Sequence, residues 1–109
     1  MNYKNLIVWQ KSMDLVIEVY KLLENFPKNE EYALKDQIRR SVISIPSNLA
    51  EGSSRDKKEF RHYLKISLGS LYELNTQLEI AKRLKYIKNY PNTIVEIEKM
   101  LKSLLKSLQ

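Results

Sequence analysis

Apolar residues recur along this chain at steps of three and four, the spacing of one face of an α-helix. In residues 6–25 they form two adjacent lines: Trp9, Met13, Val16, Tyr20 and Leu23, and beside them Val8, Leu15, Val19, Leu22 and Phe26. One line is enough to cover one neighbouring helix. Two adjacent lines predict a helix that faces the core and one further surface. Asn5 is the expected N-cap, and Phe26-Pro27 the expected end.

The same spacing predicts a second helix over residues 30–51 and a third that ends near residue 84. The apolar line of the second is Leu34, Ile38, Val42, Ile45 and Leu49, and it continues in phase across Pro46, so we expect a bend there. Gly52 is its expected C-terminal stop. The third helix has Asp56 as its expected N-cap, with Glu59 completing a capping box. Its line is Phe60, Leu64, Ser67, Leu71, Leu74, Leu78 and Ala81.

A fourth helix is predicted from Thr93, which begins another capping-box match, to residue 108. Its apolar line is Ile94, Ile97, Leu101, Leu104 and Leu108. The connections are short, so consecutive helices should be antiparallel. With only 2 glycines and 3 prolines, the chain leaves little room for a turn-rich β fold. We therefore predict one all-α domain over residues 1–109, an up-down-up-down four-helix bundle with a kink at Pro46.

The residues around Pro46 support two interpretations. In the first, Ser44, Ser47 and Asn48 only satisfy the carbonyls that the proline leaves free. In the second, a polar stripe along the second helix and a matching line on the third form a partly buried contact surface. The stripe is Gln37, Ser41, Ser44, Asn48 and Glu51, and the matching line is Ser70, Glu73 and Gln77, with Gly69 allowing close backbone approach. Arg39, Arg40 and Arg55 are candidates to pair with Glu51 or Glu73, although their planar guanidinium groups would also suit RNA phosphate.

No catalytic or metal-binding constellation emerges from the residue types. The chain has no cysteine and a single histidine, His62, so thiolate catalysis and zinc–thiolate sites are excluded. A di-metal site in a bundle needs two Glu-x-x-His motifs, and Glu59-Phe60-Arg61-His62 is a lone match. We therefore expect no enzyme activity and no cofactor. Trp9 is expected to pack in the core or an interface.

The net charge of +6 favours anionic partners, although lysines also coat ordinary soluble helices. The best candidate for nucleic-acid binding is the basic, aromatic corner between the third and fourth helices. It contains Lys82, Arg83, Lys85, Tyr86 and Lys88, with Tyr90 beside them. A solvated turn is the alternative. No apolar run approaches membrane-spanning length, and the N-terminal residues lack a signal-peptide layout, so we expect a cytoplasmic protein with no membrane contact.

Four segments carry a resemblance to a known family: "LIVWQKSMDL", "QIRRSVISIPSNLAEG", "FRHYLKISLGSLYELNTQLEIA" and "IEKMLKSLLKSL". In this order, over residues 6–108, the chain resembles the bacterial 23S rRNA intervening-sequence proteins. One departure is Ala33, where many relatives have glycine. The resemblance implies a four-helix bundle that assembles into a ring-like homopentamer and whose biochemical role is poorly defined. The related accessory variability proteins of retroelements form basic pentameric barrels that bind a reverse transcriptase and nucleic acid.

Two functions follow as expectations. The first is a non-enzymatic homo-oligomeric scaffold that binds RNA or a ribonucleoprotein through basic surface. The alternative is a protein–protein adaptor, such as a reverse-transcriptase accessory subunit. In either, we expect Arg40, Asn48, Glu51 and Glu73 to hold the bundle and its interfaces together.

Overall fold

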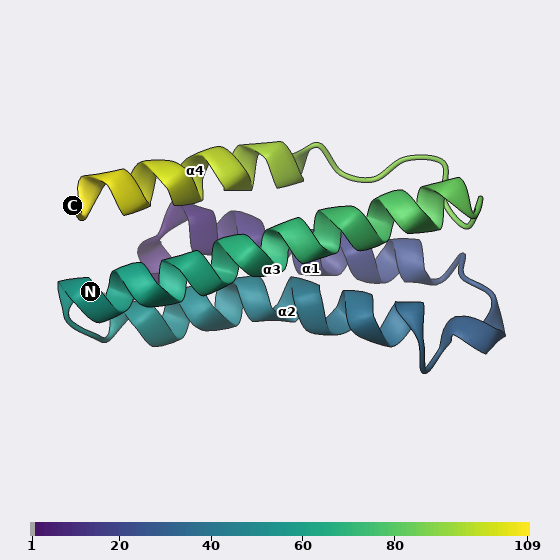
Figure 1. Cartoon of the computed structure of the whole chain (residues 1–109), viewed down its shortest axis with the longest axis horizontal. Coiled ribbons are helices and arrows are strands. Elements are labelled where there is room, and N and C mark those ends of the chain that lie inside the picture. The colour runs from purple at the N-terminus through teal and green to yellow at the C-terminus, as the bar shows by residue number, and fades with distance from the viewer. Residues whose placement is uncertain (1) are drawn as a thin grey trace.

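A computed structural model describes residues 2–109, which fold into four α-helices that lie along one direction (Figure 1). They are α1 (Ile7–Leu23), α2 (Leu34–Ser53), α3 (Lys57–Arg83) and α4 (Thr93–Ser107), and two 3₁₀ helices, η1 (Tyr3–Asn5) and η2 (Lys28–Glu30), precede α1 and α2. α1 and α3 run opposite to α2 and α4, so both termini lie at one end (Figure 1). α2 packs on α1 and α3, and α4 packs on the same two helices from the other side. The predicted all-α bundle is confirmed.

The core consists of the apolar lines that the spacing predicts. In α2 and α3 every residue of the predicted line except Leu34 is buried, including Ser67, whose hydroxyl donates to the Ile45 carbonyl at 2.9 Å. In α1 the structure decides between the two adjacent lines. Val8, Leu15 and Val19 face the core, and so does Leu23 at the end of the other line. The rest of that other line lies at the edge of the core, as Trp9 and Val16 do, or is exposed, as Met13 and Tyr20 are.

α4 is shorter than α3 and covers only the N-terminal half of α3 (Figure 1). The connection between α3 and α4 covers the other half. Ile87 is buried there, and Tyr86 packs on the Phe26 ring with 5.2 Å between ring centroids. We expected this connection to be a basic, aromatic binding corner or a solvated turn, and its contribution to the core was not predicted.

Several predicted helix ends are wrong, for local reasons. Asn5 belongs to η1 and not to the cap of α1, since Leu6 precedes α1 without any side-chain cap. α2 begins at Leu34, not at residue 30, because Ala33 has φ −121° and ψ −111°, outside the helical region. Asn92, not Thr93, precedes α4, and its side chain makes no capping hydrogen bond. Asp56 does cap α3, accepting from the Glu59 N–H at 2.9 Å.

α2 runs without interruption across Pro46. Side chains one turn away bond two neighbouring carbonyls: Ser47 Oγ donates to the Ile43 carbonyl and Asn48 Nδ2 to the Ser44 carbonyl, both at 2.8 Å. Neither is the Val42 carbonyl, which Pro46 leaves without its helical N–H, so the prediction that these side chains satisfy the freed carbonyl is wrong. Pro46 itself is buried.

Candidate interaction surfaces

The line of α1 that does not enter the core forms an apolar face with α2. Its hollow, of about 310 Å³, is lined by Tyr3, Trp9, Met13, Val16, Ile43, Pro46, Ser47 and Ala50. Met13 and Ile43 remain 40% and 43% exposed, and Ile17 and Tyr20 extend the exposed stripe along α1. We call this surface the α1–α2 face. Contiguous apolar surface of this kind is typical of contact with another molecule, which fits the two adjacent lines predicted for this helix.

On the other side of α2 lies a polar groove, which we call the α2–α3 groove. It has a volume of about 460 Å³ and is lined by Gln37, Arg40, Ser41, Ser44, Ile66, Ser70, Glu73 and Gln77. The Ser44 and Ser70 hydroxyls are hydrogen-bonded to each other at 2.8 Å, and Asn48 Nδ2 donates to Ser44 Oγ at 2.8 Å. The structure thus brings the two predicted polar lines together.

Two of the three arginines near this groove have other partners than expected. Arg39 binds Glu31, and Arg40 binds Asp36 at 3.0 Å, so the predicted pairing of these arginines with Glu51 or Glu73 is wrong. In both cases a closer carboxylate precedes the arginine along the chain. Lys35, followed by Arg39, holds the pKa of the Glu31 carboxyl below its ordinary value by hydrogen bonding.

Arg55 does pair with Glu51, at 3.2 Å. This bond raises the pKa of the Arg55 guanidinium. The guanidinium also reaches Glu59 at 3.4 Å and lies over the Tyr63 ring, 5.6 Å from its centroid. Arg55 therefore fastens the tight connection between α2 and α3, and its charge is largely committed to that structure.

The two glycines have the reverse of their expected roles. Gly52 lies inside α2, which ends one residue later, and has no positive φ, so it is not a helix stop. A Cβ on Gly52 would meet Tyr63 Cβ at 2.6 Å, and the residue thus allows α2 and α3 to approach closely. Gly69 was expected to have that role, but a Cβ there would have no heavy atom within 4 Å. The sequence could not separate them, since both lie beside polar residues.

The predicted basic corner is anchored by its aromatic residues. Tyr86 OH donates to Glu30 at 2.8 Å, which raises the pKa of the Tyr86 phenol. Tyr90 OH donates to Glu79 at 2.7 Å, and this bond, with the weaker contribution of Arg83 at 3.1 Å, lowers the pKa of the Glu79 carboxyl. Both rings are half-buried. Their role in the structure is to hold the connection in place.

The lysines of this corner are exposed. Lys82, Lys85 and Lys88 form no ion pair with any residue of the described chain, 2–109. Lys82 Nζ lies over the Tyr90 ring, 5.9 Å from its centroid. Lys85 has φ 66°, the conformation that favours glycine. Three free cations therefore surround a connection whose backbone is fixed.

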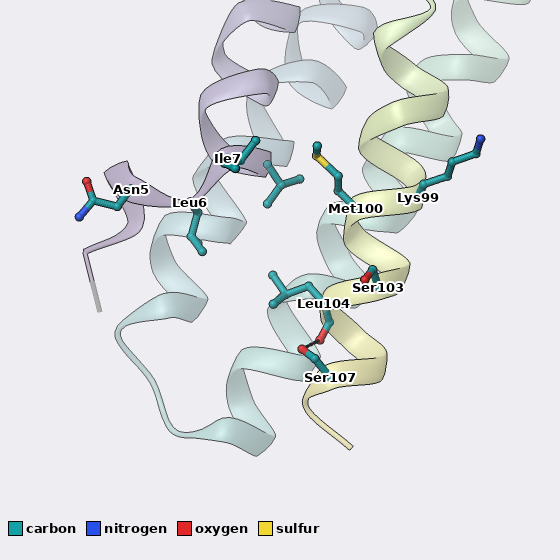
Figure 2. Close-up of a pocket in the computed structure, with 9 residues that line it drawn as sticks. Asn5, Leu6, Ile7, Lys99, Met100, Ser103, Leu104 and Ser107 are labelled. Carbon is teal, nitrogen blue, oxygen red and sulfur yellow. Dashed lines mark hydrogen bonds between the residues drawn. The ribbon is translucent and has the colours of Figure 1, made fainter.

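A further apolar groove, of about 620 Å³, lies between the start of α1 and the second half of α4 (Figure 2). Leu6 and Leu104 extend into it from opposite sides, whereas Lys99 points away (Figure 2). Ser107 donates to the Leu104 carbonyl at 2.7 Å, so its hydroxyl is engaged within α4. The groove therefore offers apolar contact and few directed polar groups. Sequence reasoning missed it because it depends on how far α4 extends.

The described residues contain no cluster of three or more His, Cys, Asp or Glu side chains able to hold a metal ion. Within the same range no helix is both long and apolar enough to cross a membrane. The described residues do present four surfaces: an apolar face, a polar groove, a basic corner and the apolar groove beside α4.

These surfaces lie on an antiparallel four-helix bundle with a buried, continuous core. The chain belongs to the family of 23S rRNA-intervening sequence proteins, whose model matches residues 4–109. A crystal structure from Bacteroides thetaiotaomicron, of a protein with unknown function from the S23 ribosomal protein family, is similar at 27% sequence identity. It has a TM-score of 0.64, and the match covers 94% of each chain. No curated protein matches the chain.

Proposed function

We propose that this protein is a non-enzymatic, cytoplasmic, homo-oligomeric scaffold that binds structured RNA or a ribonucleoprotein through the basic corner between α3 and α4. The observation that carries the proposal is the arrangement of Lys82, Lys85 and Lys88. All three are exposed and form no ion pair within residues 2–109, and they surround a backbone that Tyr86 and Tyr90 hold in place. Cations carried by an anchored backbone bind phosphates with less loss of backbone conformational entropy than cations on a mobile loop do.

Assembly is the second part of the proposal. The α1–α2 face exposes Met13, Ile17, Tyr20 and Ile43 on two adjoining helices, with Trp9 half-buried beside them. Burial of this apolar surface against another copy would favour association. The family resemblance implies a homopentamer, and a ring would place several basic corners on one particle. Multiple corners would raise affinity for a long RNA by avidity.

The experiment measures binding of a fluorescently labelled structured RNA by anisotropy, at salt concentrations from about 50 to about 200 mM. We expect the triple variant Lys82→Gln, Lys85→Gln, Lys88→Gln to bind more weakly and to reduce the slope of log K against log salt by about 2 to 3. The matched control is Lys58→Gln, Lys65→Gln, Lys99→Gln, which removes the same charge from exposed lysines elsewhere. Equal loss in both triple variants, or salt-insensitive binding, would contradict a site at this corner.

The alternative function is a protein–protein adaptor, such as a reverse-transcriptase accessory subunit, and the α1–α2 face supports it. Light scattering after size-exclusion chromatography, with and without nuclease, separates the two. We expect an oligomer whose absorbance shows nucleic acid that nuclease removes. A clean oligomer that binds no RNA would favour the adaptor, and a reverse-transcriptase gene beside this one would favour it further. A monomeric protein would contradict the homo-oligomer, whether it serves as an RNA-binding scaffold or as an adaptor.

A further inference from the structure

The α2–α3 groove contains two acceptors that nothing in the described chain satisfies. The Glu73 side chain is exposed, and its carboxylate has neither an ion pair nor a hydrogen bond to residues 2–109. Gln77 lies one helical turn further along α3, and its Oε1 is buried without a partner. Buried polar atoms without partners are rare in folded proteins. Glu73 lies one turn from Gln77 on the same face of α3, and it is the accessible anionic group of the groove, so a cationic group from outside would pair with it.

The other charged group at the groove does not supply that cation. Arg40 lines the groove but is bound to Asp36 at 3.0 Å, and its side chain is 80% exposed. Ser41, Ser44 and Ser70 have small side chains, which leaves room beside Glu73. The groove is therefore polar, open and short of a positive charge.

The complementary charge lies on the other flank of α2. Lys21 lines a hollow beside the α1–α2 face together with Ile17, Tyr20, Lys35 and Arg39. Lys35 and Arg39 are both engaged by Glu31, so Lys21 is the cation of this hollow with no ion pair in the part of the chain that the structure describes. Glu24, also exposed, is the remaining charged group there.

Lys21 and Glu73 lie at the same level of the bundle, that is, at about the same position along its long axis. Lys21 neighbours positions 35 and 39 of α2, and Glu73 neighbours positions 37 and 40 of the same helix. They face opposite flanks of α2, so one chain cannot join them. When two copies are related by a rotation about an axis parallel to the bundle, positions at one level meet. The flank that carries Lys21 then lies against the flank that carries Glu73.

We propose that the α2–α3 groove binds the α1–α2 face of a second copy, with Lys21 of that copy donating to Glu73. This inference rests on the homo-oligomer of the proposed function and identifies the contact that forms it. The contact is heterologous, because each copy contributes Lys21 to one neighbour and Glu73 to the other. Such a contact generates a closed ring when repeating the same rotation returns to the first copy. Ile17 and Tyr20, beside Lys21, would bury apolar surface at the rim of the groove.

Charge reversal tests the contact. We expect Glu73→Lys and Lys21→Glu each to weaken self-association about ten-fold or more, measured as the oligomer dissociation constant by sedimentation velocity. The double variant should regain the wild-type constant to within about three-fold, because it restores the pair with its sign exchanged. The control is Glu18→Lys. Glu18 is an exposed acid without an ion pair to residues 2–109, and it lies on the side of α1 that bears Lys11, the partner of Glu96 in α4. Circular dichroism checks folding, and Glu73→Gln is the milder variant to use if Glu73→Lys does not fold.

Zero-length carbodiimide coupling identifies the partner residue. Equal amounts of ¹⁴N- and ¹⁵N-labelled protein are mixed, coupled and digested, and we expect a Lys21–Glu73 peptide pair of mixed label. An oligomer with no such pair, or one in which the double variant fails to regain association, overturns the inference and leaves the proposed function intact. A wild-type monomer at all concentrations overturns both.

Discussion

At the scale of single residues, the two glycines make opposite predictions for the same substitution. Gly52→Ala places a Cβ 2.6 Å from Tyr63 Cβ and 3.0 Å from Phe60 Cδ1, so α2 and α3 must separate at their closest approach. We expect it to lower the free energy of unfolding by about 1 to 3 kcal/mol. Gly69→Ala meets nothing within 4 Å in the interior of α3. It should raise that free energy by about 0.5 to 1 kcal/mol, because alanine has the higher helix propensity.

Urea titration followed by circular dichroism measures both substitutions. Each variant serves as the other's control, since the chemical change is identical and only the surroundings differ. Equal effects of the two substitutions would mean that α2 and α3 are not in close contact at Gly52.

The residue scale also shows what the sequence determines and what it does not. The polar character of Ser47 and Asn48 was enough to predict that they bond to carbonyls near Pro46, because these bonds are local, whereas the Ser44 hydroxyl bonds to Ser70 on α3. The partners of Arg39 and Arg40 were missed because each arginine has carboxylates within reach on its own segment and elsewhere. Only the fold decides among them.

At the scale of elements, the end of α3 is a Schellman motif without its usual glycine. The Tyr86 N–H donates to the Ala81 carbonyl and the Lys85 N–H to the Lys82 carbonyl, both at 3.0 Å. Lys85, the donor of the second bond, occupies the position where this motif usually has glycine, and its φ is 66°. We expect Lys85→Gly to raise the free energy of unfolding by about 1 kcal/mol, because glycine adopts this conformation without a Cβ clash.

Thermal unfolding checks this prediction, with Lys88→Gly as the control. Lys88 is an exposed lysine of the same connection and has no positive φ, so the same substitution there should not stabilise the fold. If both variants lose stability equally, the left-handed conformation of Lys85 carries no strain. A gain in stability together with weaker RNA binding would suggest that the side chain of Lys85 is retained for function at the expense of stability.

The helices themselves were predictable, whereas their ends were not. A line such as Phe60, Leu64 and Leu71 fixes one face of a helix through its spacing alone. An end depends on one or two backbone torsions, as at Ala33, and side chains that can cap are common in loops as well. The wrong N-caps at Asn5 and Thr93 and the correct one at Asp56 all had suitable residue types.

At the scale of the whole molecule, the sequence predicted a surface only where that surface follows a single helix. The α1–α2 face was anticipated because two apolar lines adjoin on one segment, and the polar stripe of α2 because its residues share one spacing. The apolar groove beside α4 and the level at which Lys21 and Glu73 lie depend on how four helices align. No periodicity contains that information.

Ion pairs distributed over the whole molecule should make its stability depend on acid pH. The pKa values of three carboxyls are lowered: that of Glu31 by Lys35 and Arg39, that of Glu79 by Tyr90 and Arg83, and that of Glu98 by Tyr72 and Lys102. A carboxyl whose pKa is lower in the folded state stabilises the fold above its unfolded pKa, which is about 4.3. That contribution is lost as pH falls through the folded value.

We therefore expect the thermal midpoint to change little between about pH 7 and pH 5 and to fall steadily below about pH 4.5. Protonation also increases the excess of positive charge, whose self-repulsion acts in the same direction. Glu98→Gln should reduce the decrease of the thermal midpoint at acid pH. The substitution removes one carboxyl with a lowered pKa, together with its bonds to Tyr72 and Lys102. Glu18→Gln is the matched control, and a midpoint equal at pH 3 and pH 7 would show that these ion pairs do not stabilise the bundle.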